Sequence, residues 1–400
     1  MKAEDFSPDR RRFLVPLPDG NWAFVPPVLP VSLDLSADAL LALGRADRAV
    51  GRLNGIGSWM PNPYLLIQPF IRREAVLSSK IEGTQASLSD LALYEASPAP
   101  VAGLPRDVQE VANYVRALED ALRPGQPLPV SLRLIQQLHA TLLEGVRGHE
   151  TRPGEFRTIQ NYIGHPGSPI EEASYVPPPP MQMLEALRAL ELYLHAESKL
   201  PPLVRLALTH YQFEAIHPFR DGNGRVGRLL IAVLLVEEQL IGQPLLYLSA
   251  YFERERAGYY SLLARVSQHG EWDAWLRFFL TGVEEQALDA VVRAGRLLGL
   301  RDVYRRRLES ARASALPLRL VDGLFDSPVL TITAAQRELG VTHRAASLNV
   351  DKLVQAGVVS PVPGRVRNQL FIASEILDLL ERDLPPAVEK EPEQQAFDLA

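Results

Sequence analysis

The stretch His217-Pro-Phe-Arg-Asp-Gly-Asn-Gly-Arg-Val-Gly-Arg228 is the most informative part of this 400-residue chain. Its histidine ends an expected helix over 201–216, and the proline that follows prevents that helix from continuing. Gly222 and Gly224 allow the backbone to approach a ligand closely, and a second, apolar helix is expected over 223–240. Because the first N–H groups of a helix suit a phosphate chain, the stretch predicts an anion site between two helices.

Four side chains of this stretch carry chemistry. Arg225 and Arg228 are three residues apart, so they lie on one helix face, as a clamp on a polyphosphate requires. Asp221 offers a hard oxygen ligand for Mg²⁺, and His217 can take a proton near neutral pH. The lysine of a phosphate-binding P-loop is missing, so the pattern favours another type of nucleotide site.

The stretch resembles the Fic family motif, His-x-Phe-x-(Asp/Glu)-Gly-Asn-Gly-Arg-x-x-Arg, at every specified position. Fic enzymes transfer AMP from ATP to a Ser, Thr or Tyr hydroxyl of a protein and release pyrophosphate. The resemblance implies that His217 is the base, that Asp221 holds Mg²⁺ and that Arg228 contacts the γ-phosphate. The other ATP-binding positions that it implies are Gly222, Asn223, Gly224, Arg225, Val226 and Gly227.

A second segment, Ser78-Ser-Lys-Ile-Glu82-Gly83, resembles the inhibitory-helix pattern of the same family, (Ser/Thr)-x-x-x-Glu-(Gly/Asn). The resemblance implies that Glu82 pairs with Arg228, which the γ-phosphate needs, and that the chain inhibits itself. In some relatives this glutamate positions a water molecule that removes AMP. Removal of AMP therefore stays open beside transfer, as does a purely structural role of Glu82.

Two further segments fit the family less sharply. The segment 158–164 resembles the flap that pairs with a target peptide, although it also fits an ordinary surface hairpin. A segment after the motif helix lies where the family builds its adenine pocket, although its tyrosines also fit a core. The flap residues are Ile159, Gln160, Asn161, Tyr162 and Ile163, and the adenine-pocket candidates are Tyr251, Tyr259 and Tyr260.

The apolar periodicity predicts a mainly α chain with one small β excursion and a carboxy-terminal part that resembles a winged helix. The resemblance to the Fic family implies that the body is a Fic-type helical core and that the β excursion is its small β-hairpin flap. The first 30 residues look like an extended arm, and separate helices are expected at 253–268, 271–280 and 284–315. The expected units are an extension over 1–104 with the inhibitory helix at about 64–83, a catalytic core over 105–283, a connecting helix over 284–316, a winged-helix-like domain over 317–380 and an acidic tail over 381–400.

The winged-helix expectation depends on a helix, a turn at Gly340 and a second helix, followed by two strands over 358–372. It opens a second hypothesis, a nucleotide-sensing regulator that binds DNA, although the basic residues there exceed the acidic ones only modestly. These are Arg344, Lys352, Arg365 and Arg367 against Asp351. Apolar faces of this domain and of the long helix also predict a homodimer.

The composition restricts the remaining possibilities. Hydrophobic residues make up 46% and charged residues 22% of the chain, as in folded soluble proteins. The net charge of −6 argues against a chain-wide grip on nucleic acid, and the lack of cysteine excludes thiolate chemistry. The amino terminus is unlike a signal peptide, and the longest apolar run, 229–236, is too short to span a membrane. We therefore expect a cytoplasmic protein whose partners are ATP and a protein substrate, the chain itself included.

Overall fold

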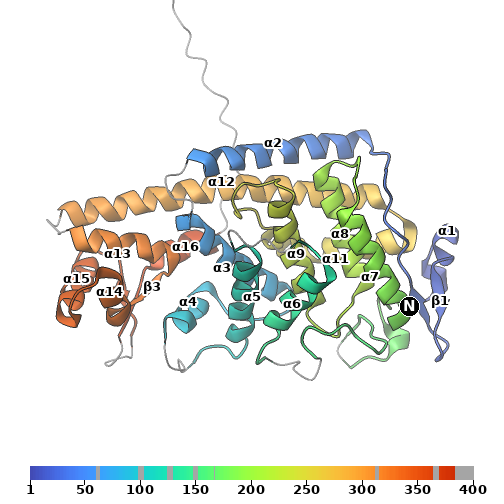
Figure 1. Cartoon of the computed structure of the whole chain (residues 1–400), viewed down its shortest axis with the longest axis horizontal. Coiled ribbons are helices and arrows are strands. Elements are labelled where there is room, and N and C mark those ends of the chain that lie inside the picture. Colours follow the sequence, from blue (N-terminus) through green and yellow to red (C-terminus); the bar gives the residue numbers. More distant parts are fainter. Residues whose placement is uncertain are drawn as a thin grey trace, which may run out of the picture.

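The computed structural model describes residues 1–59, 64–97, 103–123, 129–146, 152–165, 167–310, 315–363 and 369–382. Two long helices, α2 (Ala37–Trp59) and α12 (Trp272–Ser310), run side by side along one edge of the molecule, and the shorter helices hang beneath them (Figure 1). Within the described ranges, no helix combines the length and the apolar character needed to cross a bilayer.

The helices that carry the sequence motifs surround α9 (Asn223–Glu237), which is buried on all sides from Val226 to Leu235. A helix that is apolar all round must lie in the core, and α9 is contacted by α3, α5, α6 and α8. The elements of this body are α3 (Tyr64–Ile81), α4 (Leu88–Ala96), α5 (Val108–Ala121), α6 (Leu132–Leu142), η3 (Ile170–Glu172), α7 (Pro180–His195), α8 (Pro202–Ile216), α10 (Ser249–Arg254) and α11 (Arg256–His269).

The prediction of a break between helices at 271–280 and 284–315 is wrong, because α12 is continuous from Trp272 to Ser310. Gly282 lies between the two expected ranges and serves a close contact. A Cβ atom at this position would lie 2.6 Å from Cδ1 of Tyr251, so the glycine lets α10 approach α12. The expected helix at 253–268 is likewise divided, into α10 and α11.

The first 30 residues form an arm with a little structure of its own. It contains η1 (Ala3–Asp5), α1 (Pro8–Arg11) and an antiparallel hairpin of β1 (Leu14–Pro16) and β2 (Trp22–Phe24). Phe6 and Phe24 stack on each other and pack against Ala173 and Val176 beyond the expected flap. The flap itself has a single antiparallel bridge, Ile163 to Tyr175, where the sequence predicted a short hairpin.

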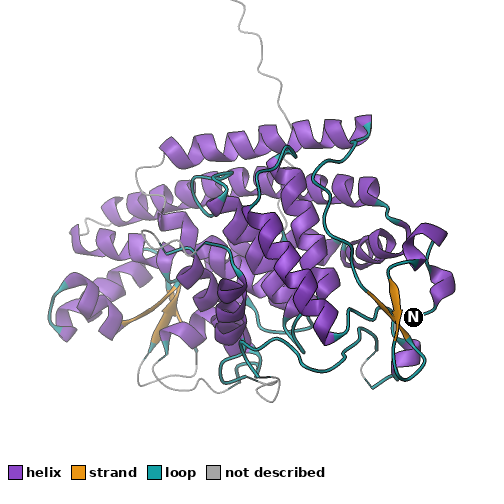
Figure 2. Cartoon of the chain, turned by 45° about the vertical axis from the view of Figure 1, so that its right-hand side comes forward, coloured by secondary structure: helices purple, strands orange, loops and turns teal. Residues whose placement is uncertain are grey.

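The carboxy-terminal part consists of α13 (Ala315–Asp326), β3 (Val329–Thr331), α14 (Ile332–Leu339), α15 (His343–Gln355), β4 (Ser360–Pro361), β5 (Leu370–Ile372) and α16 (Ser374–Glu381). The strands form an antiparallel sheet in the order β3-β5-β4, which Figure 2 shows in orange beside the helices. The assignment as a winged helix stays a prediction, since residues 364–368 of the expected wing, with Arg365 and Arg367, and the tail from 383 onward lie outside the described residues.

This carboxy-terminal part is joined to the rest by one continuous core. A single cluster of buried apolar side chains extends from Leu29 to Leu380, and α13 packs on α3. Arg73 of α3 also donates to the carbonyl oxygen of Leu380 at the end of α16 (2.9 Å). The segment expected to be inhibitory is therefore packed between the motif helix on one side and the carboxy-terminal part on the other.

Candidate functional site

The motif stretch forms a short loop between α8 and α9. His217 follows the last residue of α8 in a left-handed conformation (φ 51°, ψ 61°), which reverses the chain. The Asn223 side chain closes the loop, since it accepts from the backbone N–H of Phe219 (2.8 Å) and donates to its carbonyl oxygen (2.9 Å). The loop thus holds its own shape, and what Asn223 can offer a ligand is its backbone N–H.

The start of α9 is open to an anion. Its N-cap residue is Gly222, with φ +76°, and no side chain caps the helix. The first N–H groups of any α-helix lack an acceptor within the helix, and the helix dipole adds partial positive charge there. A 15-residue helix with an uncapped amino terminus between two arginines is suited to phosphate groups.

The Arg228 guanidinium is held by the last turns of α3. Its Nη2 lies 2.7 Å from Oε1 of Glu82 and donates to the carbonyl oxygen of Ser78 (2.9 Å), while its Nε donates to the Ser78 hydroxyl (2.8 Å). The arginine side chain is 1% exposed and the glutamate 33%. The Glu82–Arg228 contact expected from the family pattern is therefore present.

The electrostatics of this pair favour two charged groups. Burial opposes ionisation of Glu82, but the Arg228 guanidinium, with Arg225 and His217, outweighs it and lowers the pKa. Burial also disfavours the charge of Arg228, yet the Glu82 carboxylate raises the pKa of Arg228 above its usual value. Nη1 of Arg228 is buried and has no partner among the described residues, so one donor remains for a ligand.

Gly224 is needed where Glu82 meets the motif helix. A Cβ atom at this position would lie 2.4 Å from Oε1 of Glu82 and 2.9 Å from Nη1 of Arg228. Atoms cannot approach so closely, so any larger residue would push the carboxylate away. The second glycine of the motif therefore gives Glu82 the room to reach Arg228.

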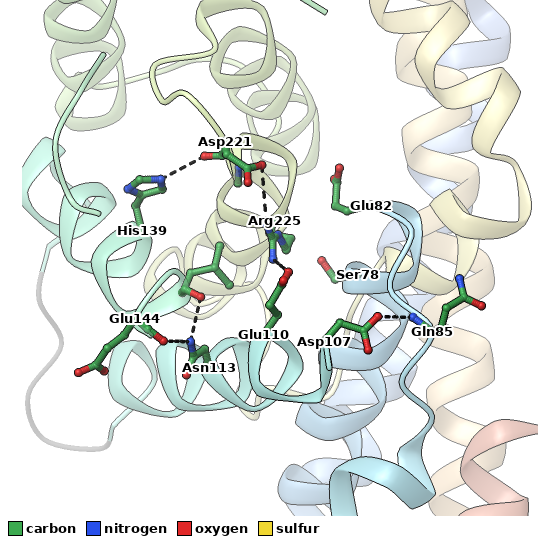
Figure 3. Close-up of polar contacts among 12 residues, drawn as sticks. Ser78, Glu82, Gln85, Asp107, Glu110, Asn113, His139, Glu144, Asp221 and Arg225 are labelled. Atoms are coloured by element: carbon green, nitrogen blue, oxygen red, sulfur yellow. Dashed lines mark hydrogen bonds and ion pairs between the residues drawn. The ribbon is translucent and has the colours of Figure 1, made fainter. Parts of the chain in front are cut away.

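Arg225 is paired with a carboxylate that the sequence analysis missed. Its Nη1 lies 2.7 Å from Oε2 of Glu110 on α5, and its Nη2 lies 3.8 Å from Oδ1 of Asp221 (Figure 3). The two motif arginines are thus separately neutralised, Arg228 from α3 and Arg225 from α5. No short motif marks Glu110, because its role depends on how α5 packs against α9.

His139 of α6 is a second residue that the sequence analysis missed. Its ring stacks on Phe219 with the centroids 3.7 Å apart. Nδ1 accepts from the backbone N–H of Gly154 (2.8 Å), so Nε2 carries the proton and donates to the carbonyl oxygen of Asp221 (3.1 Å; Figure 3). Burial lowers the pKa of His139 to about 4, which keeps this tautomer neutral.

The His217 imidazole is partly buried at the start of the motif loop. Its Nδ1 is buried and unpartnered within the described ranges. Burial, and after it the charge of Arg157, lowers the pKa of His217 to about 4, against the opposite effect of Glu82 and Asp221. The ring is therefore neutral at pH 7.

Asp221 fits one part of a magnesium site. Its side chain is 53% exposed beside the open start of α9, and its Oδ1 accepts from the N–H of Gly222 (2.6 Å). Within the described ranges, no group of three or more acidic or histidine side chains is placed to hold a metal. Because Mg²⁺ usually takes one or two carboxylates plus phosphate oxygens and water, Asp221 could supply the protein's share.

Two further carboxyl groups have raised pKa values, one on a buried side chain and one on a partly buried side chain. Glu74 of α3 accepts from Tyr114 (3.1 Å) and from the Ser249 hydroxyl (2.5 Å), and burial raises its pKa to about 7. Glu214 of α8 has a buried Oε1 without a described partner. A Cβ atom at Gly227 would lie 2.1 Å from that oxygen, so this glycine makes room for the carboxyl group. Burial raises the pKa of Glu214 to about 8.

The remaining expected site residues divide into buried and accessible ones. Val226 is buried, as are Tyr251 and Tyr259, and the Tyr259 hydroxyl meets Nε2 of His210 (2.8 Å) within a cluster of core aromatics. Of the three tyrosines, only Tyr260 presents an exposed ring, at 43%. Its pKa is raised, mainly by burial and then by Glu82, so it lies near the pair at Arg228.

The flap residues are also of two kinds. Ile159, Tyr162 and Ile163 expose large apolar side chains. Gln160 and Asn161 instead hold the flap, through hydrogen bonds to the carbonyl oxygens of Pro177 and Phe219 (both 2.9 Å). The exposed members could meet a partner, and the other two fix the segment that carries them.

The sequence matches two models of one protein family and several named relatives. The model of the Fic/DOC family N-terminal region matches residues 40–123, and the Fic/DOC family model matches residues 129–235. The protein adenylyltransferase Fic of Drosophila virilis is 34% identical over 166 residues, and that of Drosophila grimshawi is 33% identical. Each match covers 41% of this chain and 30% of the relative, so the matched part is less than a third of those proteins.

The fold has a solved counterpart. A Fic family protein from Desulfovibrio desulfuricans G20 aligns with a TM-score of 0.54 over 85% of this chain and 97% of its own, at 19% identity. Similarity at that identity concerns the fold. Together with the two family matches, it confirms the mainly helical architecture expected from the sequence. Residues 40–123 and 129–235 therefore match, in order, the N-terminal region and the main domain of the Fic/DOC family.

Proposed function

We propose that the chain is a protein adenylyltransferase, which transfers AMP from ATP to a Ser, Thr or Tyr hydroxyl of a protein. The observation that carries the proposal is the uncapped start of α9, flanked by Arg225 and Arg228 and preceded by His217. The relatives named protein adenylyltransferase Fic support it. The chain itself is one of the substrates we propose.

In this reaction, the backbone N–H groups at the start of α9 and the two arginines bind the triphosphate. The target hydroxyl oxygen bonds to the α-phosphorus, the bond from that phosphorus to the pyrophosphate oxygen breaks, and His217 takes the hydroxyl proton. A Mg²⁺ ion held by Asp221 would supply charge for the phosphate oxygens. His139, through the carbonyl oxygen of Asp221, keeps the loop in place.

We further propose that Glu82 inhibits the chain. A carboxylate 2.7 Å from the Arg228 guanidinium occupies the cation that a γ-phosphate needs. Glu82 lies one residue beyond the end of α3 and is one-third exposed, which supports a contact that can be released. The same exposure would let Glu82 hold a water molecule, so removal of AMP from a modified protein is a second activity to test.

Labelled ATP tests the proposed transfer. The Glu82→Gly variant is incubated with ATP labelled at either the α- or the γ-phosphate, and the protein is separated by denaturing electrophoresis. AMP transfer requires protein-bound label from the α position only. Label from the γ position would mean phosphoryl transfer and would overturn the proposal. Glu82→Gly with His217→Ala is the matched control and should retain no label.

The carboxy-terminal part supports a second candidate, a regulator that binds DNA and senses a nucleotide. Its support is the order α13, β3, α14, α15, β4, β5 and α16, in which Gly340 ends α14 with φ +68°. DNA binding by a positive surface requires an affinity that falls steeply with salt. A salt titration of the full chain against mixed-sequence duplex DNA that shows no such slope would exclude this candidate. Light scattering in parallel tests the expected homodimer.

A further inference from the structure

Three consecutive carbonyl groups of the motif loop are bound by one short segment, 157–161, which begins one residue before the flap. The backbone N–H of Arg157 donates to Pro218 (2.9 Å), and Nε of the same residue donates to His217 (3.0 Å). Nδ2 of Asn161 donates to Phe219 (2.9 Å). The segment 157–161 and the loop that presents the imidazole are therefore one hydrogen-bonded unit, although about 60 residues separate them in the sequence.

Arg157 is the centre of this unit. It is 3% exposed, and its Nη1 and Nη2 donate to the carbonyl oxygens of Ile159 (3.2 Å) and Pro178. Among the described residues, no carboxylate lies within ion-pair distance of its guanidinium. Buried charges are normally paired, because an unpaired charge in a protein interior costs on the order of several kcal/mol. An arginine that serves only backbone oxygens beside the site therefore calls for a role.

The backbone of His217 provides such a role. Its left-handed conformation is disfavoured for any residue with a Cβ atom, so surrounding contacts must hold it. The Nε hydrogen bond fixes the carbonyl group of His217, and the N–H of Arg157 fixes the next one. We propose that Arg157 is a positioning residue, which locks His217 into its left-handed conformation and ties the imidazole to the flap. The expected effect of Arg157 on AMP transfer rests on the function proposed above.

The charge of Arg157 gives the proposal an independent signature. The groups that face the His217 ring are Arg157 just before the flap, Glu82 beyond α3, Asp221 in the loop and the backbone of Glu214 on α8. After burial, Arg157 is the strongest influence that lowers the pKa of His217, while Glu82 and Asp221 raise it. Removal of the guanidinium charge should therefore raise the pKa of His217. A lysine at position 157 should keep the charge but lose the side-chain hydrogen bonds to the three carbonyl oxygens of His217, Ile159 and Pro178.

The experiment compares Arg157→Met and Arg157→Lys with Arg205→Met. Arg205 is the matched control, because it also donates to several carbonyl oxygens, those of Tyr193, Leu194 and Ala196, away from the motif loop. For each full-length variant, the His217 ring is titrated by NMR and assigned by comparison with His217→Gln. Self-modification with labelled ATP, the ATP Kd by calorimetry and thermal unfolding are measured on the same samples.

We expect Arg157→Met to raise the His217 pKa and to slow modification by about tenfold or more, with ATP binding changed by less than about threefold. Arg157→Lys should slow modification while the pKa stays near its original value, and Arg205→Met should alter neither. An unmoved His217 pKa in Arg157→Met, with a rate loss no greater than that of Arg205→Met, would overturn the proposal. Because the titration needs no substrate, it still tests the link from Arg157 to His217 if AMP transfer itself is not found.

Discussion

The two motif arginines face carboxylates of different character. Glu82 lies just beyond the end of α3 and is followed by Gly83, whose φ of +98° marks a tight turn. Glu110 lies inside the first turn of α5, and its side chain is 19% exposed against 33% for Glu82. Glu82 lies in a turn after the end of a helix, where a few backbone rotations would move it, and Glu110 lies within a helix fixed by its packing.

The two arginines also differ in the contacts that they would keep if the paired carboxylate were removed. Arg228 keeps two hydrogen bonds to Ser78, so its guanidinium stays in place without Glu82. Without Glu110, the remaining described ion-pair partner of Arg225 is Asp221, at 3.8 Å. In the proposed function, the pair at α3 is therefore the contact that is released, and the pair at α5 is the one that stays.

The strongest test removes the His217 imidazole. His217→Ala should slow transfer by ~10²- to 10⁴-fold, the usual contribution of a general base. ATP binding should persist, because Arg225, Arg228 and the start of α9 remain. Calorimetry measures this, and a variant that loses ATP binding together with transfer would contradict the separation of base from phosphate site.

Glu82→Gly tests the releasable pair. A charged hydrogen bond contributes roughly 1.5–3 kcal/mol, so freeing Arg228 should raise self-modification by about tenfold to a hundredfold. The gain should vanish in Glu82→Gly with Arg228→Ala, since the freed cation is gone. If the single variant only melts at a lower temperature and takes up no more label, Glu82 is a structural residue.

Glu110→Gln should act in the opposite direction. It keeps the shape of the side chain but leaves Arg225 without its neutralising charge, so we expect transfer to fall by about threefold to tenfold and the free energy of unfolding by about 1–2 kcal/mol. Glu82→Gln is the matched control and should raise transfer. If both glutamine variants change transfer in the same direction, the two pairs have equivalent roles.

The smallest expected effect concerns pH. Burial, against the opposing charge of Arg228, raises the pKa of Glu214 to about 8, so the folded state holds a proton that the unfolded chain releases above about pH 4.5. Its contribution to stability is full at low pH and is lost as pH rises to 8. Glu214→Gln should remove a decline on the order of 2 kcal/mol between pH 5 and 8, measured by urea unfolding. The decline should also shrink in Glu82→Gly, because the Glu82 charge raises the same pKa.

These comparisons show what the sequence could and could not predict. His217, Asp221 and the two arginines lie within twelve consecutive residues, and Glu82 lies in a recognisable pattern, so local spacing was enough to find them. Glu110, His139 and Arg157 reach the site from α5, α6 and the segment just before the flap, and nothing in their neighbouring residues marks that. The contact between Gly282 and Tyr251 likewise depends on tertiary packing, so nothing in the neighbouring residues marks it.

The continuity of α12 fixes a length in the molecule. Thirty-nine residues at about 1.5 Å each make a rod of about 58 Å without a break, and the carboxy-terminal helices are anchored along it and on α3. A partner bound by the carboxy-terminal part would thus be held at a fixed distance from His217. Only acceptor hydroxyls that lie at the matching distance from that partner's own contact would come within reach.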